Sequence, residues 1–164
     1  MMRRTHKQSG FTLIELLLAI AIMAILAALA APLFGDNDAL QLDSAKRLLI
    51  SDLEYTQILA ITNPDKAIGL VFDEAGTGWH IASLDDPLTP LIDSISGDPL
   101  LVEFGKGTAI YIVDVTISTN AAKDCIEYDI GGGLSNFMTD AEITLTTATG
   151  VKIVTIDPIT GSIH

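Results

Sequence analysis

An apolar run near the N-terminus, long enough to cross a lipid bilayer, constrains this chain most strongly. Between residues 11 and 34 only Thr12, Glu15 and Pro32 are not apolar. A helix of this length reaches about 36 Å, and the hydrocarbon core of a bilayer is about 30 Å thick. No other stretch is as long and as apolar. A protein that crosses the membrane several times is therefore excluded.

The distribution of charge also changes at the start of the apolar run. Arg3, Arg4 and Lys7 precede the run without any acid, although the whole chain has 9 basic and 21 acidic residues and a net charge of -12. Positive charge before a span predicts a single-pass inner-membrane protein with its N-terminus in the cytoplasm and its soluble domain exported. An acidic domain disfavours nucleic acid as a partner, because phosphate contacts need cations.

The chain of 164 residues has room for one ordinary soluble domain after the run. A short polar break at residues 35–38 offers helix N-cap residues, and an amphipathic helix is expected from about Ala39 to Thr62. Asn63-Pro64 ends it. The apolar residues that recur at helical spacing predict the face packed on a sheet: Leu42, Ala45, Leu49, Leu53 and Ala60.

After Pro64 the pattern changes to short β-rich runs separated by turn residues. The segment Asp85–Pro99 is expected to be a loop, and Ala109–Ile117 has the clearest strand alternation. The predicted class is α+β, with an N-terminal helix packed on an antiparallel sheet domain over residues 64–164. The predicted strands are Ala67–Phe72, Gly78–Leu84, Leu100–Phe104, Ala109–Ile117, Cys125–Ile130, Ala141–Thr147 and Val151–Ile156.

Three interpretations of the apolar run compete. A secretory signal peptide would use the small residues Ala28-Leu29-Ala30 for cleavage, but Glu15 damages its apolar region. A plain membrane anchor tolerates Glu15: an acid costs about 2.5–3.5 kcal/mol at mid-membrane, and the Leu, Ile and Phe residues return about 4–8 kcal/mol in sum. Neither explains the carboxylate, which as an ionisable group in a membrane helix suggests a function and a partner.

The third interpretation supplies the partner. The run Ser9-Gly10-Phe11-Thr12-Leu13-Ile14-Glu15 after a basic leader resembles the type III signal sequence of type IV pilins and type II secretion pseudopilins. The resemblance implies that prepilin peptidase removes residues 1–10 by cutting between Gly10 and Phe11, and that Phe11 is N-methylated. It also implies that Glu15 directs assembly, that Pro32 kinks the helix, and that residues 11–34 and 35–63 form two parts of one helix.

These implied roles make physical sense. A glycine before the cut lets a protease approach the backbone closely. The amine freed on Phe11 is cationic, and Glu15 of a neighbouring helix can pair with it, which offsets a desolvation cost that neither charge could bear alone. The partners implied are prepilin peptidase and other pilins or pseudopilins in a filament, with secreted cargo as a further candidate; no cofactor is implied.

The rest of the chain resembles the GspH/FimT-like minor pseudopilins more loosely. The similarity lies in Gly69–Asp73 followed by Gly78-Trp79-His80-Ile81, and in the ending Asp157-Pro158-Ile159-Thr160-Gly161. The glycine turn at residues 131–133 departs from the single-glycine turn usual there. This resemblance implies a minor pseudopilin of a type II secretion pseudopilus or a type IV pilus-like filament.

Other candidate sites are weaker. No enzyme motif occurs, and Gly105-Lys106-Gly107-Thr108 lacks the order of a phosphate loop, so an enzyme is not expected. Trp79 is expected to anchor the core, and Cys125, the one cysteine, to be a buried hydrophobe that forms no disulfide framework or cysteine zinc site. The acid pairs Asp73-Glu74 and Asp85-Asp86 could bind Ca²⁺ or be solvated surface, and metal sites are otherwise not expected.

Two alternative functions stay open. One is a FimT-like minor pilin that binds DNA for natural transformation. The tail Gly161-Ser162-Ile163-His164 contains no arginine to contact phosphate, which disfavours this alternative. The other is an exported ligand-binding domain on a membrane anchor.

Overall fold

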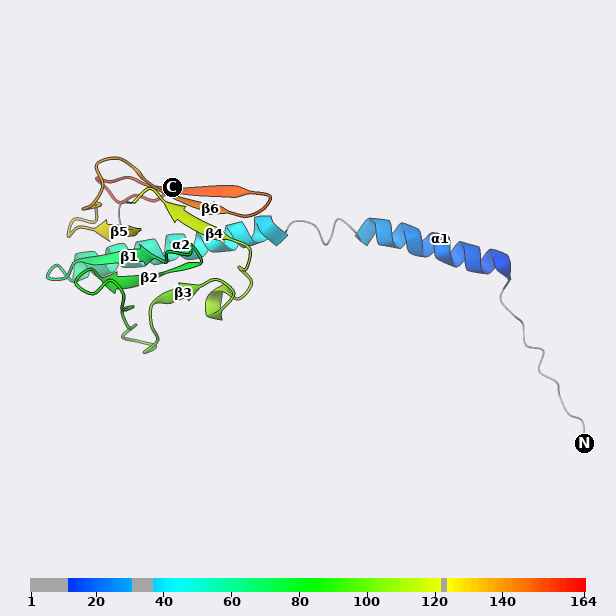
Figure 1. Cartoon of the computed structure of the whole chain (residues 1–164), viewed down its shortest axis with the longest axis horizontal. Helices are drawn as coiled ribbons and strands as arrows, with labels where there is room; N and C mark the ends of the chain where they lie inside the picture. Colours follow the sequence, from blue (N-terminus) through cyan, green and yellow to red (C-terminus); the bar gives the residue numbers. More distant parts are fainter. Residues whose placement is uncertain (1–11, 31–36, 122–123) are drawn as a thin grey trace, which may run out of the picture. The chain divides into compact units, whose positions relative to one another are not determined.

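A computed structural model describes residues 12–30, 37–121 and 124–164. The chain divides into two compact units, Met1–Asn37 and Asp38–His164. The described part of the first unit is one helix, α1 (Leu13–Ala30). The second contains α2 (Asn37–Thr62), seven strands and a short 3₁₀ helix, η2 (Gly107–Ala109) (Figure 1).

The face of α2 predicted to pack on a sheet is confirmed. Every apolar residue of the predicted stripe is buried, and the polar residues Gln41 and Thr56 are buried beside it. The Thr56 hydroxyl donates to the backbone oxygen of Asp52 at 2.6 Å, one turn earlier, so it needs no partner outside the helix. At the C-terminal end, the Leu59 oxygen accepts both the backbone N of Asn63 at 3.0 Å and its Nδ2 at 2.9 Å, so the Asn63 side chain is bonded to the last turn of the helix.

The first sheet has four antiparallel strands in the order β3-β2-β1-β5. They are β1 (Ile68–Phe72), β2 (Gly78–Ser83), β3 (Leu101–Glu103) and β5 (Cys125–Tyr128). The β1–β2 hairpin pairs Phe72 with Trp79 and Ile68 with Ser83. The outer edge of β5 is covered by the segment that follows it, because Ser135 N donates to the Glu127 oxygen and Asn136 Nδ2 to the Cys125 oxygen.

The second sheet has three antiparallel strands in the order β4-β6-β7. They are β4 (Thr116–Thr119), β6 (Ala141–Thr146) and β7 (Val151–Ile156), and the β6–β7 hairpin pairs Ala141 with Ile156. The predicted β7 is confirmed at both ends. On β6 the residues Ala141, Ile143 and Leu145 are buried and alternate with more exposed ones, which is the pattern of a sheet with one wet face.

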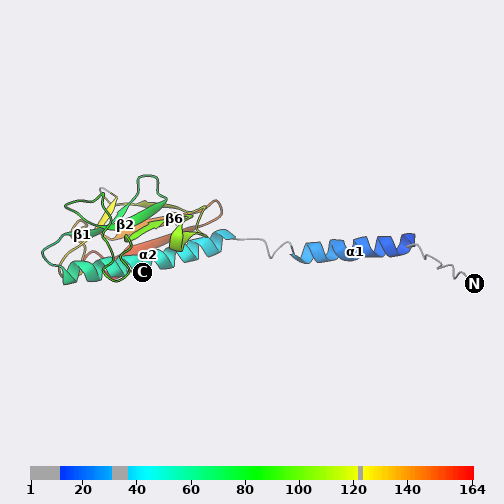
Figure 2. The ribbon, with the colours of Figure 1, turned by 90° about the horizontal axis from the view of Figure 1, so that it is seen from below.

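One core joins α2 to both sheets. It contains Leu49 and Leu53 from the helix with Leu70, Ile126 and Leu145 from the strands, all at 0% exposure. Viewed from below, α2 lies along one side of the strands (Figure 2). The predicted α+β class, a helix packed on antiparallel sheet, is therefore confirmed, and α2 is the helix that packs.

The strand predicted over Ala109–Ile117 is wrong for most of its length. The chain makes η2 and turns there, and β4 begins only at Thr116. Ala109, Ile112 and Val115 are buried at intervals of three positions, which is incompatible with strand alternation; the interval of two appears only from Val115 to Ile117, where β4 begins. The backbone N–H groups of Val113 and Asp114 donate to Gln41 Oε1 on α2 at 2.9 and 3.1 Å, so they are bonded to a side chain and not to a neighbouring strand.

The segment Asp85–Pro99, predicted as a loop, contains only isolated bridges. Ala82 pairs with Pro90 and Ile92 with Pro99. Leu91 is partly buried against the core, and its N–H donates to the Ile81 oxygen at 2.8 Å. The connection thus returns once to the edge of the first sheet before β3 begins.

Candidate functional site

The predicted assembly residue Glu15 lies in the first turn of α1, where it caps the helix. Thr12 N and Thr12 Oγ1 each donate to Glu15 Oε2 at 3.0 Å. In return Glu15 N donates to Thr12 Oγ1 at 3.3 Å. This reciprocal arrangement is a capping box, in which two of the open donors at a helix start are satisfied.

Sequence reasoning missed this second role of Glu15. The signal was present, because Thr12-Leu13-Ile14-Glu15 has the spacing of a threonine followed three residues later by a glutamate, ahead of an apolar helix. Glu15 therefore begins α1 as well as interrupting its apolar surface.

The described side chains of α1 are exposed on every side of the helix. The large apolar ones range from 48% exposed at Ile22 to 81% at Leu13. In water such a surface is strongly unfavourable, at roughly 25 cal/mol per Å² of apolar area. An apolar partner, either lipid or other helices, is what this surface fits. The exposed large residues are Leu13, Ile14, Leu16, Leu17, Leu18, Ile20, Ile22, Met23, Ile25 and Leu26.

The other predicted site residues, Gly10, Phe11 and Pro32, lie outside the described residues, as does the leader at residues 1–10. Of the predicted site, the structure therefore describes Glu15 alone. Among the helices as described, none has both the length and the hydropathy required to cross a membrane.

Trp79 anchors the core, as predicted, and does so through a carboxylate that sequence reasoning did not single out. The indole is 1% exposed, and its ring meets Phe104 edge-on with centroids 5.6 Å apart. Its Nε1 donates to Asp52 Oδ2 of α2 at 2.7 Å. Burial raises the pKa of Asp52, and the hydrogen bond from Trp79 opposes that shift. The pair fastens α2 to β2.

The remaining candidates have structural partners. Asp73 accepts from Thr77 N and Thr77 Oγ1, both at 2.6 Å, and so closes the β1–β2 turn. His80 Nε2 lies 2.8 Å from the Pro87 oxygen. Cys125 is buried in β5, as expected. No group of three or more histidine, cysteine or acidic side chains that could hold a metal ion occurs within residues 12–30, 37–121 and 124–164.

A shallow hollow lies at the C-terminal end of α2. Its volume is about 310 Å³, and Ala60, Tyr128 and Ile130 supply apolar walls, with Lys66 and Glu127 among its charged residues. Tyr128 is 3% exposed, and its Oη has no hydrogen-bond partner in the described part of the chain. Burial, followed by the charge of Glu54, raises the pKa of this phenol well above its usual value.

Comparison with known proteins finds one family model and one curated relative that match part of the chain. The family model described as the prokaryotic N-terminal methylation motif matches residues 5–31, a range that includes Gly10, Phe11 and Glu15. Fimbrial protein EcpB of Eikenella corrodens is 62% identical over 34 residues, which cover 21% of this chain and 21% of that relative. The chain thus matches about a fifth of the length of this relative. No solved structure matches this chain.

The family-model match falls on the segment that contains the basic residues Arg3 to Lys7 in part, the Gly10-Phe11 junction and Glu15. The matched range includes the whole of α1, and the unit that contains α2 and the strands follows it in the chain. The comparisons therefore show that part of this chain is similar to the prokaryotic N-terminal methylation motif and to a fimbrial protein, over about a fifth of its length or less.

Proposed function

We propose that the chain is a minor pseudopilin, a structural and non-enzymatic subunit of a type II secretion pseudopilus or a type IV pilus-like filament. The observation that carries the proposal is the methylation motif at residues 5–31, which ends in the apolar helix α1. Prepilin peptidase cuts between Gly10 and Phe11, and Phe11 is then N-methylated. The mature chain waits in the inner membrane with its N-terminus toward the cytoplasm and residues 38–164 outside.

The proposed assembly step uses Glu15. The cationic amine of Phe11 and the carboxylate of Glu15 on a neighbouring helix form an ion pair inside the bundle of apolar helices. Such a pair fixes the axial register between subunits, which is the best-attested use of a buried polar contact. The Thr12–Glu15 capping box supports this proposal, because it keeps the carboxylate hydrogen-bonded until a neighbour arrives. Pro32 would kink the helix on its way to α2.

The minor subgroup is supported by the shape of the domain's two hairpins. The β1–β2 hairpin places Trp79 opposite Phe72, and the β6–β7 hairpin is followed by the Pro158–Gly161 turn. Both are the places where the sequence resembles the GspH/FimT-like group.

The test is Glu15→Ala in cells that carry the whole assembly machinery. We expect the leader to be removed and the chain to reach the membrane as usual, because the cut lies before Glu15, while incorporation into filaments is lost. The readouts are the mass of the mature chain and its amount in sheared filaments. Glu74→Ala, which removes an exposed acid from the β1–β2 turn, is the matched control and should assemble normally. Normal incorporation of Glu15→Ala would contradict the role given to this residue.

Processing is tested separately by Gly10→Leu. A bulky residue before the cut should keep the peptidase from the backbone, so the ten-residue leader stays attached and Phe11 carries no methyl group. Loss of the leader from this variant would show that the cut lies elsewhere. Intact-mass measurement decides between the two.

DNA capture is the alternative that charge disfavours. Of the 21 acidic residues none precedes residue 11, whereas Arg3, Arg4 and Lys7 would leave with the leader. A mobility shift of a DNA duplex at low salt, using the mature chain in detergent, would favour a DNA-binding minor pilin over a secretion subunit. No shift is expected.

A further inference from the structure

A group of exposed apolar side chains lies at the end of the soluble unit where α2 begins. It consists of Leu40 in the first turns of α2 and Ile110, Tyr111 and Val113 in the turn region after η2, and we call these four residues the loop patch. They are 53–85% exposed, with Tyr111 the most exposed at 85%. Exposed apolar side chains that gather in one place mark a contact surface.

The loop patch is held in place by its neighbours. Gln41, the residue after Leu40, accepts the backbone N–H groups of Val113 and Asp114 at 2.9 and 3.1 Å. Ile112 and Val115, each 3% exposed, are buried in the core and anchor the segment on either side of Val113. Ala109, which is 1% exposed, is a third buried residue, so Ile110 and Tyr111 lie between Ala109 and Ile112 and Val113 lies between Ile112 and Val115, all three exposed.

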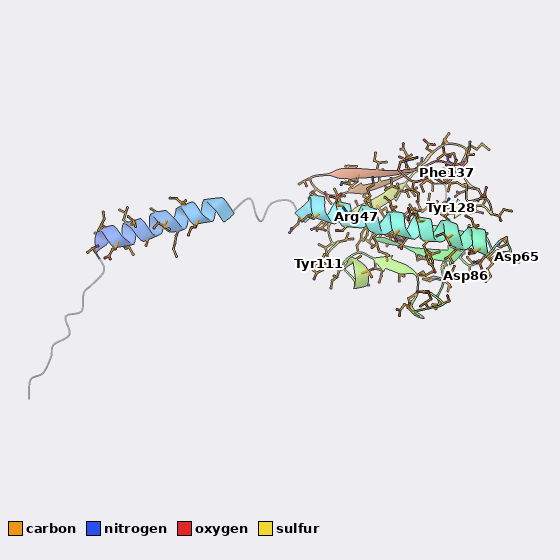
Figure 3. The ribbon with its side chains drawn as sticks, turned by 180° about the vertical axis from the view of Figure 1, so that it is seen from behind. Arg47, Asp65, Asp86, Tyr111, Tyr128 and Phe137 are labelled. Atoms are coloured by element: carbon orange, nitrogen blue, oxygen red, sulfur yellow. The ribbon has the colours of Figure 1, made fainter. Side chains whose placement is uncertain are left out.

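The patch lies at the end of the second unit where α2 begins. Figure 3 shows Tyr111 near the start of α2, with Asp65 and Asp86 toward the opposite end of the unit. Only residues 35 and 36 separate the apolar run from α2. An extended chain covers at most about 3.6 Å per residue, so the start of α2 cannot be more than about 11 Å from Phe34.

We propose that the loop patch rests on the outer surface of the lipid bilayer while the subunit awaits assembly. This inference depends on the proposed function, because it requires the apolar run to lie in the membrane. The run must then end near one face of the bilayer, and the covalent connection keeps Leu40 and the segment tied to Gln41 close to that face. Tyr111 is suited to that position, since its ring is apolar and its hydroxyl polar, and tyrosines gather where lipid meets water.

The charges around the patch define which lipid it fits. Acids and bases are balanced around it. Asp43 of α2 pairs with Lys152 and also lies within reach of the charges of Lys46 and Arg47, Lys106 before η2 pairs with Glu103, and Asp38 and Asp114 are the other acids. These residues leave no excess of positive charge for an anionic headgroup. The contact is therefore expected with zwitterionic lipid, by burial of apolar side chains and not by charge.

The test places a tryptophan in the patch of the full chain. Trp79 is the one native tryptophan and is 1% exposed, so its emission supplies a constant background. The variant Tyr111→Trp is reconstituted into phosphatidylcholine vesicles whose acyl chains are brominated close to the headgroup. We expect its added emission to shift to the blue on reconstitution and to be quenched by the brominated lipid, because the indole enters the interface.

A matched control uses an equally exposed apolar residue elsewhere. Ile95, which is 94% exposed, lies in the β2–β3 connection that also contains Asp86. The added emission of Ile95→Trp should be neither shifted nor quenched. In the combination of Tyr111→Trp with Ile110→Ser and Val113→Ser, quenching should fall, because the apolar side chains that hold the segment at the surface are lost.

The possible results separate the two proposals. Insertion is measured first, as resistance of the chain to extraction from the vesicles by alkali. A chain that does not insert overturns the proposed membrane stage and this inference with it. A chain that inserts but whose Tyr111→Trp emission is not quenched overturns the inference alone. A blue shift without quenching that grows with the protein-to-lipid ratio would identify the patch as a contact between subunits, which also overturns it.

Discussion

The two helices of this chain differ in where their apolar side chains lie. α1 exposes large apolar side chains on all sides, whereas α2 buries Leu42, Leu49 and Leu53 at 0–2% exposure against two sheets. Both sequences favour helix, so the difference lies in what surrounds them. The apolar surface of α2 is used within its own unit, and the apolar surface of α1 is left for lipid or other subunits.

The comparison predicts that truncating a buried side chain of α2 strongly lowers the free energy of unfolding of the second unit. Truncating a side chain of α1 should leave that free energy almost unchanged. Leu53→Ala should lower the free energy of unfolding by about 2–5 kcal/mol, because it leaves a cavity in a fully buried site. Leu18→Ala, at a site 59% exposed, should change it by less than about 0.5 kcal/mol. Urea unfolding of the full chain in detergent, followed by Trp79 emission, measures both. Equal effects would contradict the division between the helices.

A second prediction concerns the turn that packs on the C-terminal half of α2. Gly161 has φ +67°, and a Cβ there would collide with the Gly132 oxygen and with Gln57 Nε2. Gly161→Ala should therefore cost about 1–3 kcal/mol of unfolding free energy from strain, with the collision added. Gly97→Ala is the matched control, since Gly97 has φ +78° and open space around it. A cost no larger than that of Gly97→Ala would show that the turn does not depend on close contact with α2.

Removal of the buried hydroxyl of Tyr128, beside the hollow at the end of α2, should change the free energy of unfolding less and in the opposite direction. Removing a hydroxyl that has no partner should leave the free energy of unfolding unchanged or raise it by up to about 1 kcal/mol, so Tyr128→Phe should not destabilise. Tyr111→Phe, at an exposed site, provides the reference for loss of a solvated hydroxyl. A marked loss of stability in Tyr128→Phe alone would mean that the hydroxyl has a partner.

The smallest effect is a pH dependence at the carboxylate that joins α2 to Trp79. Because burial raises the pKa of Asp52 above 3.8, its favourable contribution is complete below that pH and is lost as pH rises through the raised pKa. Asp52→Asn keeps an acceptor for Trp79 without the buried charge. It should therefore unfold at higher urea than the native chain at pH 7, and this advantage should shrink toward pH 3.8.

Asp93 supplies the control of opposite sign. The Ile95 backbone N–H, with Ser96 adding to it, lowers the pKa of this exposed carboxyl below 3.8. Its contribution is present above pH 3.8 and is lost as pH falls through the lowered pKa. Asp93→Asn should thus be slightly less stable than the native chain at pH 7 and equal to it in acid. If both variants responded to pH in the same direction, burial would not be the cause at Asp52.

Much of the fold could be predicted because its signals are local. The buried stripe of α2 follows from helical spacing, and β1, β2, β6 and β7 follow from short β-rich runs between turn residues. The segment 109–117 could not be predicted in this way. Its structure depends on Gln41, some 70 residues earlier in the chain, which accepts two backbone N–H groups that a strand would have used.

The candidate site divides similarly. The basic leader, the Gly10-Phe11 junction and the spacing to Glu15 form a linear pattern, so the comparisons find the motif where the sequence predicts it. The Asp52–Trp79 contact joins residues 27 positions apart and needed the folded unit. The capping role of Glu15 has a local signal as well, because Thr12 stands three residues before it at the start of an apolar helix.

In the capping box the carboxylate of Glu15 already accepts hydrogen bonds from Thr12, without any neighbouring subunit. If Glu15 pairs with the amine of an adjacent subunit as proposed, assembly exchanges the Thr12 contacts for intermolecular ones, so only the difference between the two sets drives the step. An exchange of this kind runs in both directions. A subunit that leaves the filament regains its cap, and its carboxylate returns to the membrane already satisfied. Growth and retraction of the filament can then share one path, with the direction decided by the machine that supplies the work.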